Sequence, residues 1–354
     1  MTTRSKLKQM FKVARLEAGQ AFLNRRAWWV YLLALFPAAI FLVQAFVIRY
    51  EHNLYSRRGL LAPALIDSVE EGATEQQVRA RLGKPAREFR RLQTGREPVE
   101  ISSLQYSDGA RVVNFIFRNG EFERRLVRRI ASLERSRQAF AIMFQSYFLR
   151  LALFFGCLGI FMNLFRGKML DRTLHFWLLA PVDRRILLGG EYIAGLAAAL
   201  TIFIGGILVS LAITLWPLPA AEVEAFWRSQ GLAHVGAYVA ATALACLGYG
   251  SVFLASSLLV RNPIIPAAVL LLWEGANPFL PELLQRLSVL YYVRALCPEG
   301  PQLGPDAPPI IRLLFAPAIP SRTEAVVGLL AVTALVLWLG ARAVRRLQIN
   351  YSTD

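Results

Sequence analysis

The sequence predicts an all-α polytopic membrane protein with six transmembrane helices and a small α+β domain inserted between spans one and two. Of its 354 residues, 55% are hydrophobic and only 18% are charged, whereas about 25% are charged in soluble globular chains. The mean hydropathy is +0.42. The apolar residues are gathered in segments of the roughly 20 residues that a helix needs to cross a bilayer.

Five apolar segments are long enough to cross a membrane as helices: residues 28–48, 139–165, 188–215, 232–260 and 323–343. A sixth begins near residue 262, and we expect it to break at its far end, where Asn277 and Pro278 follow. Irregular backbone at membrane depth must be buried in protein or line a wet cavity. Residues 283–296 then predict a short amphipathic or re-entrant helix within an extracellular loop of residues 282–322.

Residues 1–27 predict an amphipathic helix on the membrane surface, ahead of a first span at residues 28–50. Its basic residues lie off an apolar stripe with helical spacing, which consists of Leu7, Met10, Phe11, Ala14, Ala18, Ala21 and Phe22. Such a pattern is typical of interfacial helices. A solvated basic helix that packs on a partner protein is the alternative.

The distribution of basic residues predicts that both termini are cytoplasmic. Short segments on the side of the termini contain 16 Lys and Arg residues, against 5 on the opposite side. Residues 51–137 would then lie outside with 17 Lys/Arg against 12 Asp/Glu, which is acceptable because loops beyond about 60 residues largely escape the rule. The net charge of +16 therefore indicates orientation and contact with anionic membrane lipid, and we expect no nucleic-acid partner.

Residues 51–138 form the predicted extracytoplasmic insert. Thr74 and Gln77 have the spacing of a capping box at the start of a short helix. Two turn pairs follow, Asp108–Gly109 and Asn119–Gly120, of the kind that needs positive φ. They predict a three-stranded antiparallel meander with the helix on one face, whose strands are residues 101–106, 112–117 and 122–127.

The segments Gly72–Pro85, Leu104–Tyr106 and Val113–Gly120 resemble the small outer-membrane lipoproteins of the SmpA/OmlA family. The resemblance implies an extracytoplasmic module that binds protein without catalysis, so an envelope protein or a transported substrate is its expected partner. A spacer that merely folds explains the same pattern equally well.

Motifs for catalysis and cofactor binding are absent from the sequence. Gly167-Lys168 is followed by Met169 and Gly83-Lys84 by Pro85, so no phosphate loop can place a hydroxyl on Mg²⁺. The three cysteines and three histidines are widely spaced, without a metal-ligand pattern: Cys157, Cys246, Cys297, His52, His175 and His234. We expect no catalytic residue, no metal and no directly bound cofactor; ATP and Mg²⁺ would be held by a separate ATPase subunit.

The loop of residues 166–187, between spans two and three, is the candidate interaction site. Asp171 or Thr173 can cap a short helix that Pro181 ends, and an apolar stripe lies on one face of that helix. Such a stripe on a cytoplasmic helix needs a protein partner, and the protein's own bundle is the alternative. The candidate residues are Asp171, Arg172, Thr173, Leu174, Trp177, Leu178, Pro181, Arg184 and Arg185.

The order of Asp171, Thr173-Leu174, Pro181-Val182 and the basic pair that follows resembles the permease subunits of type-2 ABC transporters. The resemblance implies an amino-terminal elbow helix, a transmembrane domain at residues 139–350 and a coupling helix that docks into a groove of the ATPase. It implies cytosolic ABC ATPase subunits and a second permease, identical or not, as partners. Two features depart from the family: Glu191 stands where many members have a basic residue, and the insert is not general.

Ionisable groups at membrane depth are candidate functional residues. Glu274 would line a transport pathway near the outer end of the fifth span, or pair with Arg294. Glu191 is the second pathway candidate, with simple pairing as the alternative. The competing function for the whole chain is a non-transporting membrane scaffold or receptor whose outer domain recruits an envelope protein.

Overall fold

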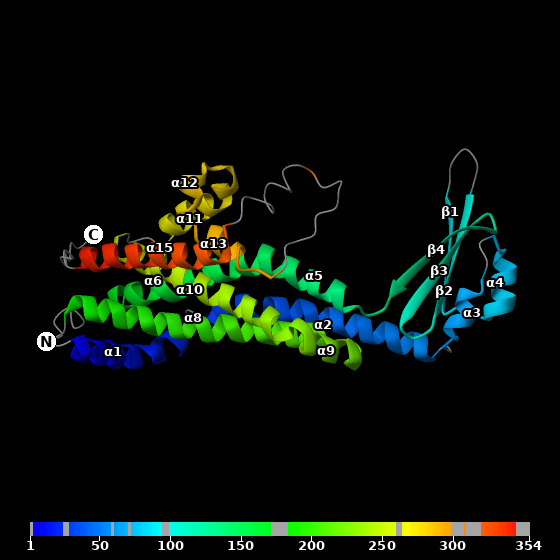
Figure 1. Cartoon of the computed structure of the whole chain (residues 1–354), viewed down its shortest axis with the longest axis horizontal. Coiled ribbons are helices and arrows are strands. Elements are labelled where there is room, and N and C mark those ends of the chain that lie inside the picture. Colours follow the sequence, from blue (N-terminus) through cyan, green and yellow to red (C-terminus); the bar gives the residue numbers. More distant parts are fainter. Residues whose placement is uncertain are drawn as a thin grey trace. The chain divides into compact units, whose positions relative to one another are not determined.

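The computed structural model describes residues 3–23, 28–57, 60–69, 72–93, 99–170, 183–259, 264–298, 308 and 320–344. They form helices and one small sheet (Figure 1). The chain divides into two compact units. The first consists of Met1–Ala39, Arg137–Ala212 and Phe226–Asp354, and the second of Ile40–Ser136 and Ile213–Ala225.

Within the described residues, five helices are long and apolar enough to cross a membrane: Trp28–Ser56, Leu133–Leu164, Arg184–Leu215, Ala220–Leu258 and Arg322–Ala343. Each coincides with one of the five predicted spans, and together they indicate a multi-pass membrane protein. Several continue beyond the apolar segment, so that the first runs as α2 from Trp28 to Arg57.

Two of these helices contain π-helical turns, which the sequence did not predict. The second span comprises α5 (Leu133–Met143), the π-helix η2 (Phe144–Ala152) and α6 (Leu153–Leu170). The fourth comprises α9 (Ala220–Phe226), the π-helix η3 (Trp227–Gly231) and α10 (Leu232–Leu259). The remaining long helices are α1 (Thr3–Leu23), α8 (Arg184–Leu215) and α15 (Arg322–Ala343).

Close helix packing in the first unit depends on glycine. The helix α10 contacts α6 and α15, and a Cβ atom at Gly250 of α10 would lie 2.5 Å from the Phe161 ring of α6. A Cβ atom at Gly206 of α8 would lie 2.6 Å from the Ala34 carbonyl oxygen of α2. A larger residue at Gly206 would push its two helices apart, and one at Gly250 would require the Phe161 ring to move.

A complete sixth span is not confirmed. The apolar helix α11 (Ile264–Ala276) has 13 residues, fewer than the roughly 20 that cross a bilayer. It ends at the predicted break, where the 3-10 helix η4 (Asn277–Phe279) follows. The short helices α12 (Glu282–Gln285) and α13 (Val289–Arg294) come next, where the sequence predicted one re-entrant segment.

The insert contains a four-stranded antiparallel sheet in the order β1-β2-β3-β4. Its strands are Arg87–Gln93, Val99–Ser107, Arg111–Arg118 and Glu121–Arg129. The helices α3 (Pro63–Asp67) and α4 (Glu75–Leu82) cover one face (Figure 1). The core between helices and sheet contains Ile66, Val69, Val78, Leu82, Leu104, Tyr106, Val113, Phe115 and Phe117.

The predicted cap and hairpins of the insert are confirmed. The Thr74 backbone N–H donates to Gln77 Oε1 at 2.9 Å, and the Gln77 N–H donates to Thr74 Oγ1 at 3.4 Å, which completes the capping box. Asn119 and Gly120 both have positive φ, at 52° and 84°, and Gly109 has 93°. The meander therefore forms where the turn residues predict it.

The strand β1 was missed because its core-facing residues are charged. Glu88 lies opposite Leu104 and Arg90 opposite Ser102, on the face that the helices cover. Both residues pair with helix α4: Arg79 Nη2 lies 2.6 Å from Glu88 Oε1, and Arg90 Nη2 lies 3.1 Å from Glu75 Oε1. Ion pairs hold this strand in place, so its sequence lacks the alternation of apolar residues that normally predicts a strand.

The core of the insert offers a matched pair of phenylalanines for a stability test. Phe115 is fully buried, whereas Phe89 on the opposite face of the sheet is 62% exposed. We expect Phe115→Ala to cost about 3–5 kcal/mol, and Phe89→Ala to cost far less. Limited proteolysis of the full chain in detergent, with urea titration, measures both; equal sensitivity of the two variants would contradict this core.

Candidate functional site

Glu274 caps the short helix α13. Its carboxylate accepts hydrogen bonds from the Ser288 hydroxyl and from the Val289 backbone N–H, the latter at 3.1 Å. Ser288 is the N-cap residue of α13, and its Oγ accepts the Tyr291 N–H at 3.2 Å. The first N–H groups of a helix have no partner within the helix, and these two side chains accept hydrogen bonds from such groups. Glu274 therefore joins the end of α11 to the start of α13.

Three more polar side chains from other elements surround this carboxylate. Arg294 at the end of α13, Arg150 of η2 and Tyr249 of α10 each interact with it electrostatically. From the sequence we named Arg294 as a possible partner of Glu274, but the capping role of Glu274 was not predicted. Arg150 and Tyr249 were not predicted as partners of Glu274, because Arg150 comes from the π-helix η2 and Tyr249 from the distant helix α10.

The capped helix α13 is a buried part of the bundle. All residues from Val289 to Val293 are buried, and α13 contacts α10, α15 and η2. Gly328 of α15 makes room for it, since a Cβ atom there would lie 2.5 Å from the Tyr292 ring. Loss of the cap would leave unpaired N–H groups inside this packed region, which is costly.

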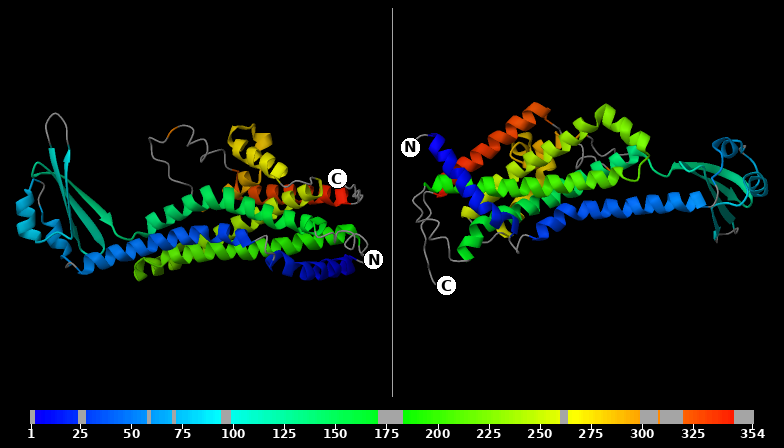
Figure 2. Two further views of the ribbon diagram at one scale, coloured as in Figure 1. Left: turned by 180° about the vertical axis from the view of Figure 1, so that it is seen from behind. Right: turned by 90° about the horizontal axis from the view of Figure 1, so that it is seen from below.

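The amino-terminal helix α1 crosses the first turns of α8 (Figure 2). A Cβ atom at Gly189 would lie 2.5 Å from Met10 Cε, and one at Gly190 would lie 2.6 Å from Val13 Cγ1. Ala14 is buried. The second pathway candidate, Glu191, is fully buried next to this crossing. The glycine pair thus lets α1 approach the backbone of α8.

The predicted apolar stripe of α1 is divided between two faces. Met10 and Ala14 lie on the face toward α8, whereas Phe11 is 59% exposed. Leu16 is 80% exposed on the same helix, among the exposed basic residues Lys8, Lys12 and Arg15. One face therefore packs on protein, and the other mixes apolar and basic groups as interfacial helices do.

Most candidate residues of the loop before α8 lie outside the described residues: Asp171, Arg172, Thr173, Leu174, Trp177, Leu178 and Pro181. The structure describes Arg184 and Arg185, which begin α8. Asp183 caps this helix: its Oδ1 accepts the Arg185 N–H at 3.0 Å, and its carbonyl accepts the Ile186 N–H at 2.8 Å. The loop therefore ends at the start of a long span.

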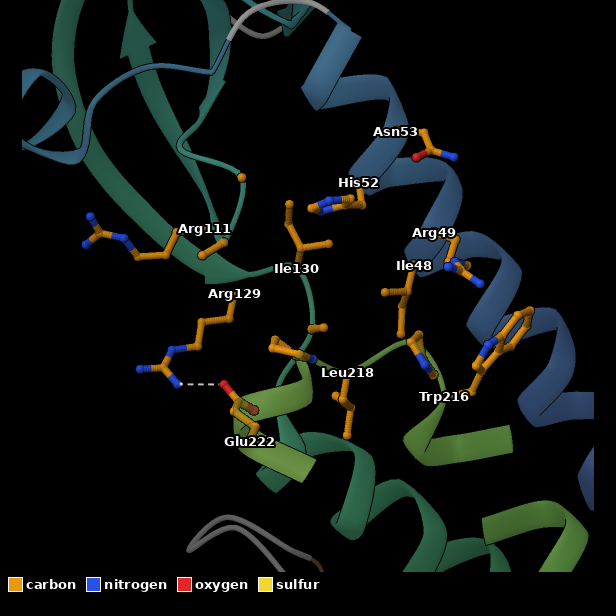
Figure 3. Close-up of a pocket in the computed structure, with 15 residues that line it drawn as sticks. Ile48, Arg49, His52, Asn53, Arg111, Arg129, Ile130, Trp216, Leu218 and Glu222 are labelled. Atoms are coloured by element: carbon orange, nitrogen blue, oxygen red, sulfur yellow. Dashed lines mark ion pairs between the residues drawn. The ribbon is translucent and has the colours of Figure 1, made fainter. Parts of the chain in front are cut away.

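A cavity of about 620 Å³ lies within the second unit (Figure 3). The last turns of α2, the turn between β2 and β3, the end of β4 and residues 216–222 line it. Its apolar lining includes Ile48, Ile130 and Leu218, and its polar lining includes Arg49, His52 and Glu222. The sequence did not predict this cavity, because its walls come from segments up to 174 residues apart.

Two of the three arginines that line this cavity have carboxylate partners. Arg111 pairs with Asp108 at 2.8 Å and with Asp67 at 3.3 Å; the hydrogen bonds to these two carboxylates raise the pKa of the Arg111 guanidinium. Arg129 lies 3.8 Å from Glu222. Arg49 instead lies over the ring of Trp216, with its Cζ atom 4.7 Å from the ring centroid.

Two cysteines that are far apart in sequence meet in the bundle. Cys157 of α6 and Cys246 of α10 are buried free thiols that interact electrostatically with each other. Cys297 is free and partly exposed just beyond α13. Among the described residues, no group of three or more His, Cys, Asp and Glu could hold a metal ion.

The reactivity of Cys297 tests the cap on α13. We expect Glu274→Ala to loosen α13 and to raise the rate of maleimide labelling at Cys297 about tenfold, since a hydrogen bond to a charged group is worth about 1.5–3 kcal/mol. Cys157 and Cys246 are buried and contribute little background. The control is Glu282→Ala, which removes an exposed carboxylate paired with Arg286; equal rates in both variants would contradict the capping role.

No family model, no curated protein and no solved structure matches the chain. A function is therefore proposed from the residues and contacts described above.

Proposed function

We propose that the chain is the permease subunit of an ABC transporter, and that it moves a substrate across the cytoplasmic membrane with ATP hydrolysed by a separate subunit. In this proposal α11, with the short helices α12 and α13, is the fifth of six spans. Two cytosolic ATPases and a second permease, identical or not, complete the complex. ATP and Mg²⁺ bind the ATPases, since this sequence has no phosphate loop.

The contact of α1 with α8 is the observation that carries the proposal. Gly189 and Gly190 hold α1 against the first turns of α8, and the loop with the apolar stripe of Leu174 and Trp177 directly precedes that helix. A force on the loop would reach α8 and α1 together. Helices packed this tightly shift as rigid bodies, so closure of an ATPase dimer would tilt the span.

The cluster around Glu274 supports a pathway role for the same region. A helix that stops inside an apolar segment leaves polar groups at membrane depth, and such groups mark substrate or ion pathways in membrane proteins. Glu274, Arg150 and Arg294 bring one acidic and two basic groups together there. In the proposed function, α13 is the element that moves when access changes.

Cysteine labelling tests the proposed orientation, in which both termini are cytoplasmic. The exposed residues Lys12 of α1 and Glu123 of β4 are suitable positions, each changed to cysteine in a Cys297→Ser background. We expect a membrane-impermeant maleimide on intact cells to label the cysteine at position 123, and the one at position 12 only after permeabilisation. The reverse pattern would overturn the orientation.

Charge substitutions in the loop test the ATPase contact. We expect Leu174→Asp and Trp177→Asp to release the ATPase from the purified complex, because each would bury a charge in a docking face at a cost of several kcal/mol. The measurement is affinity purification of the tagged chain in mild detergent from its own cells, with mass spectrometry of the subunits.

Phe176→Asp is the matched control for these variants. Position 176 lies about 100° from Trp177 on a helix and away from the stripe, so an ATPase should still copurify with that variant. Insertion of all variants in the membrane is checked by their yield. Undiminished copurification with Leu174→Asp and Trp177→Asp would leave the loop as part of the protein's own bundle.

A non-transporting scaffold or receptor is the second candidate, and the sheet of the insert favours it. On the face turned away from α3 and α4, Phe89 and Leu126 are exposed beside the exposed basic residues Arg91 and Arg124. Exposed apolar groups with a basic rim suit an acidic envelope protein. Copurification of an ATPase separates the two functions, because a scaffold needs none.

A further inference from the structure

The cavity of the second unit lies where two apolar helices end. Arg49 is the first charged residue of α2, after a largely apolar, uncharged run from Trp28. Trp216 directly follows α8, which ends at Leu215. The Phe46 ring meets the Trp216 ring edge to face, with 6.1 Å between centroids. Aromatic and basic residues at the end of spans mark the headgroup layer of a bilayer.

The floor of the cavity is a packed structure. Ile48 packs against a small core of Tyr55, Ala86, Val112 and Ile130, which joins α2 to the sheet. The Tyr55 hydroxyl donates to Gln105 Oε1 at 3.0 Å. The helix and the sheet therefore hold a preformed hollow, whose 620 Å³ lies in the usual range of about 300–1,000 Å³ for small-molecule sites.

One wall of the cavity presents hydrogen-bond donors from a single helix face. Arg49, His52 and Asn53 have the i, i+3, i+4 spacing that places side chains side by side, and all three are exposed. Figure 3 shows His52 pointing toward Ile130 and Arg49 beside Trp216. Within the described part of the chain, no carboxylate forms an ion pair with Arg49, so its charge is available to a ligand.

The acidic groups near the cavity are already engaged. Glu222 Oε2 accepts the Leu133 N–H at 3.2 Å at the start of α5, and Glu222 Oε1 faces Arg129. Asp108 accepts N–H groups from Ala110 and Arg111 and also holds the Arg111 side chain. The charge of Arg49 therefore determines which ligand charge is favoured on the α2 wall.

We propose that this cavity binds the phosphate of an anionic phospholipid headgroup, with Arg49 and His52 as its ligands and Ile48 and Leu218 against the glycerol. A guanidinium forms strong charge-assisted hydrogen bonds to phosphate, and the lining also includes apolar side chains for the lipid's glycerol region. The site lies beside the base of the insert, so lipid composition would bear on how the insert is held. This inference holds whether or not the chain is a transporter.

Native mass spectrometry of the purified full chain tests the site. The probe is an equimolar mixture of dioleoyl phosphatidylglycerol and dioleoyl phosphatidylcholine in non-ionic detergent. We expect the wild-type chain to retain phosphatidylglycerol in preference, and Arg49→Gln to lower that affinity about tenfold, as loss of one charge-assisted contact predicts. Arg49→Lys should retain most of the affinity, since it keeps the charge.

Arg118→Gln is the matched control, because Arg118 is an exposed arginine of the same unit that does not line the cavity. Equal losses in Arg118→Gln and Arg49→Gln would mean diffuse attraction and overturn the site. An unchanged affinity in Arg49→Gln would do the same.

The source of the phosphate is decided by competition. We expect glycerol 3-phosphate, at the concentration of the lipid, to displace no phosphatidylglycerol. Displacement at equal concentration would show that the cavity binds a soluble phosphate ester, and would overturn the assignment to a lipid.

Discussion

Every backbone N–H and C=O group inside a bilayer must find a hydrogen-bond partner in the protein, because hydrocarbon offers none. The five long helices meet this constraint along their own length. In the proposed six-span arrangement, the segment after Ala276 cannot meet it alone, since α11 stops there and α13 starts again at Val289. Glu274 and Ser288 supply the missing acceptors. An acidic side chain at the end of an apolar helix is thus explained first as a structural cap, on which any role in a pathway would depend.

Close approach of helices is the second constraint on the bundle. Gly189 and Gly190 admit α1, Gly206 admits α2, and Gly328 admits the ring of Tyr292. At each position the absent side chain would collide with the neighbouring helix, so the surrounding helices have few ways to move independently. In the proposed transporter, this rigidity would pass a displacement at the first turn of α8 along the span.

Two different means stabilise the face of the insert that the helices cover. Apolar packing against α3 and α4 holds β2 and β3, whereas β1 is held by ion pairs of Glu88 and Arg90 with α4. The pKa of Glu75, in the same network, is the result of opposing effects: burial raises it, but hydrogen bonds from Ser102 and Arg79 outweigh this and lower it. The carboxylate therefore stays charged at neutral pH and keeps its arginine partners.

Local patterns in the sequence were enough to predict the five apolar helices, the capping box at Thr74 and the two hairpins. Each depends on residues within a few positions of one another: a long apolar run, a Thr and Gln three apart, an Asn followed by Gly. The same local chemistry predicted the break after α11, because proline and asparagine end a helix wherever it packs. The strand β1 was not predicted, since its core-facing residues are charged and pair with α4 only in the folded structure.

The tertiary structure alone decided which distant residues meet. Glu274 reaches the start of α13, Arg49 reaches Trp216, and Cys157 reaches Cys246 across long stretches of chain. The π-helical turns of η2 were also decided by the tertiary structure, because their i to i+5 hydrogen bonds leave no periodic pattern in the residues. Spacing along a chain specifies hydrogen bonds and faces over one or two helical turns. A cavity or a polar cluster instead depends on how whole helices pack, and glycine contacts between those helices set that packing.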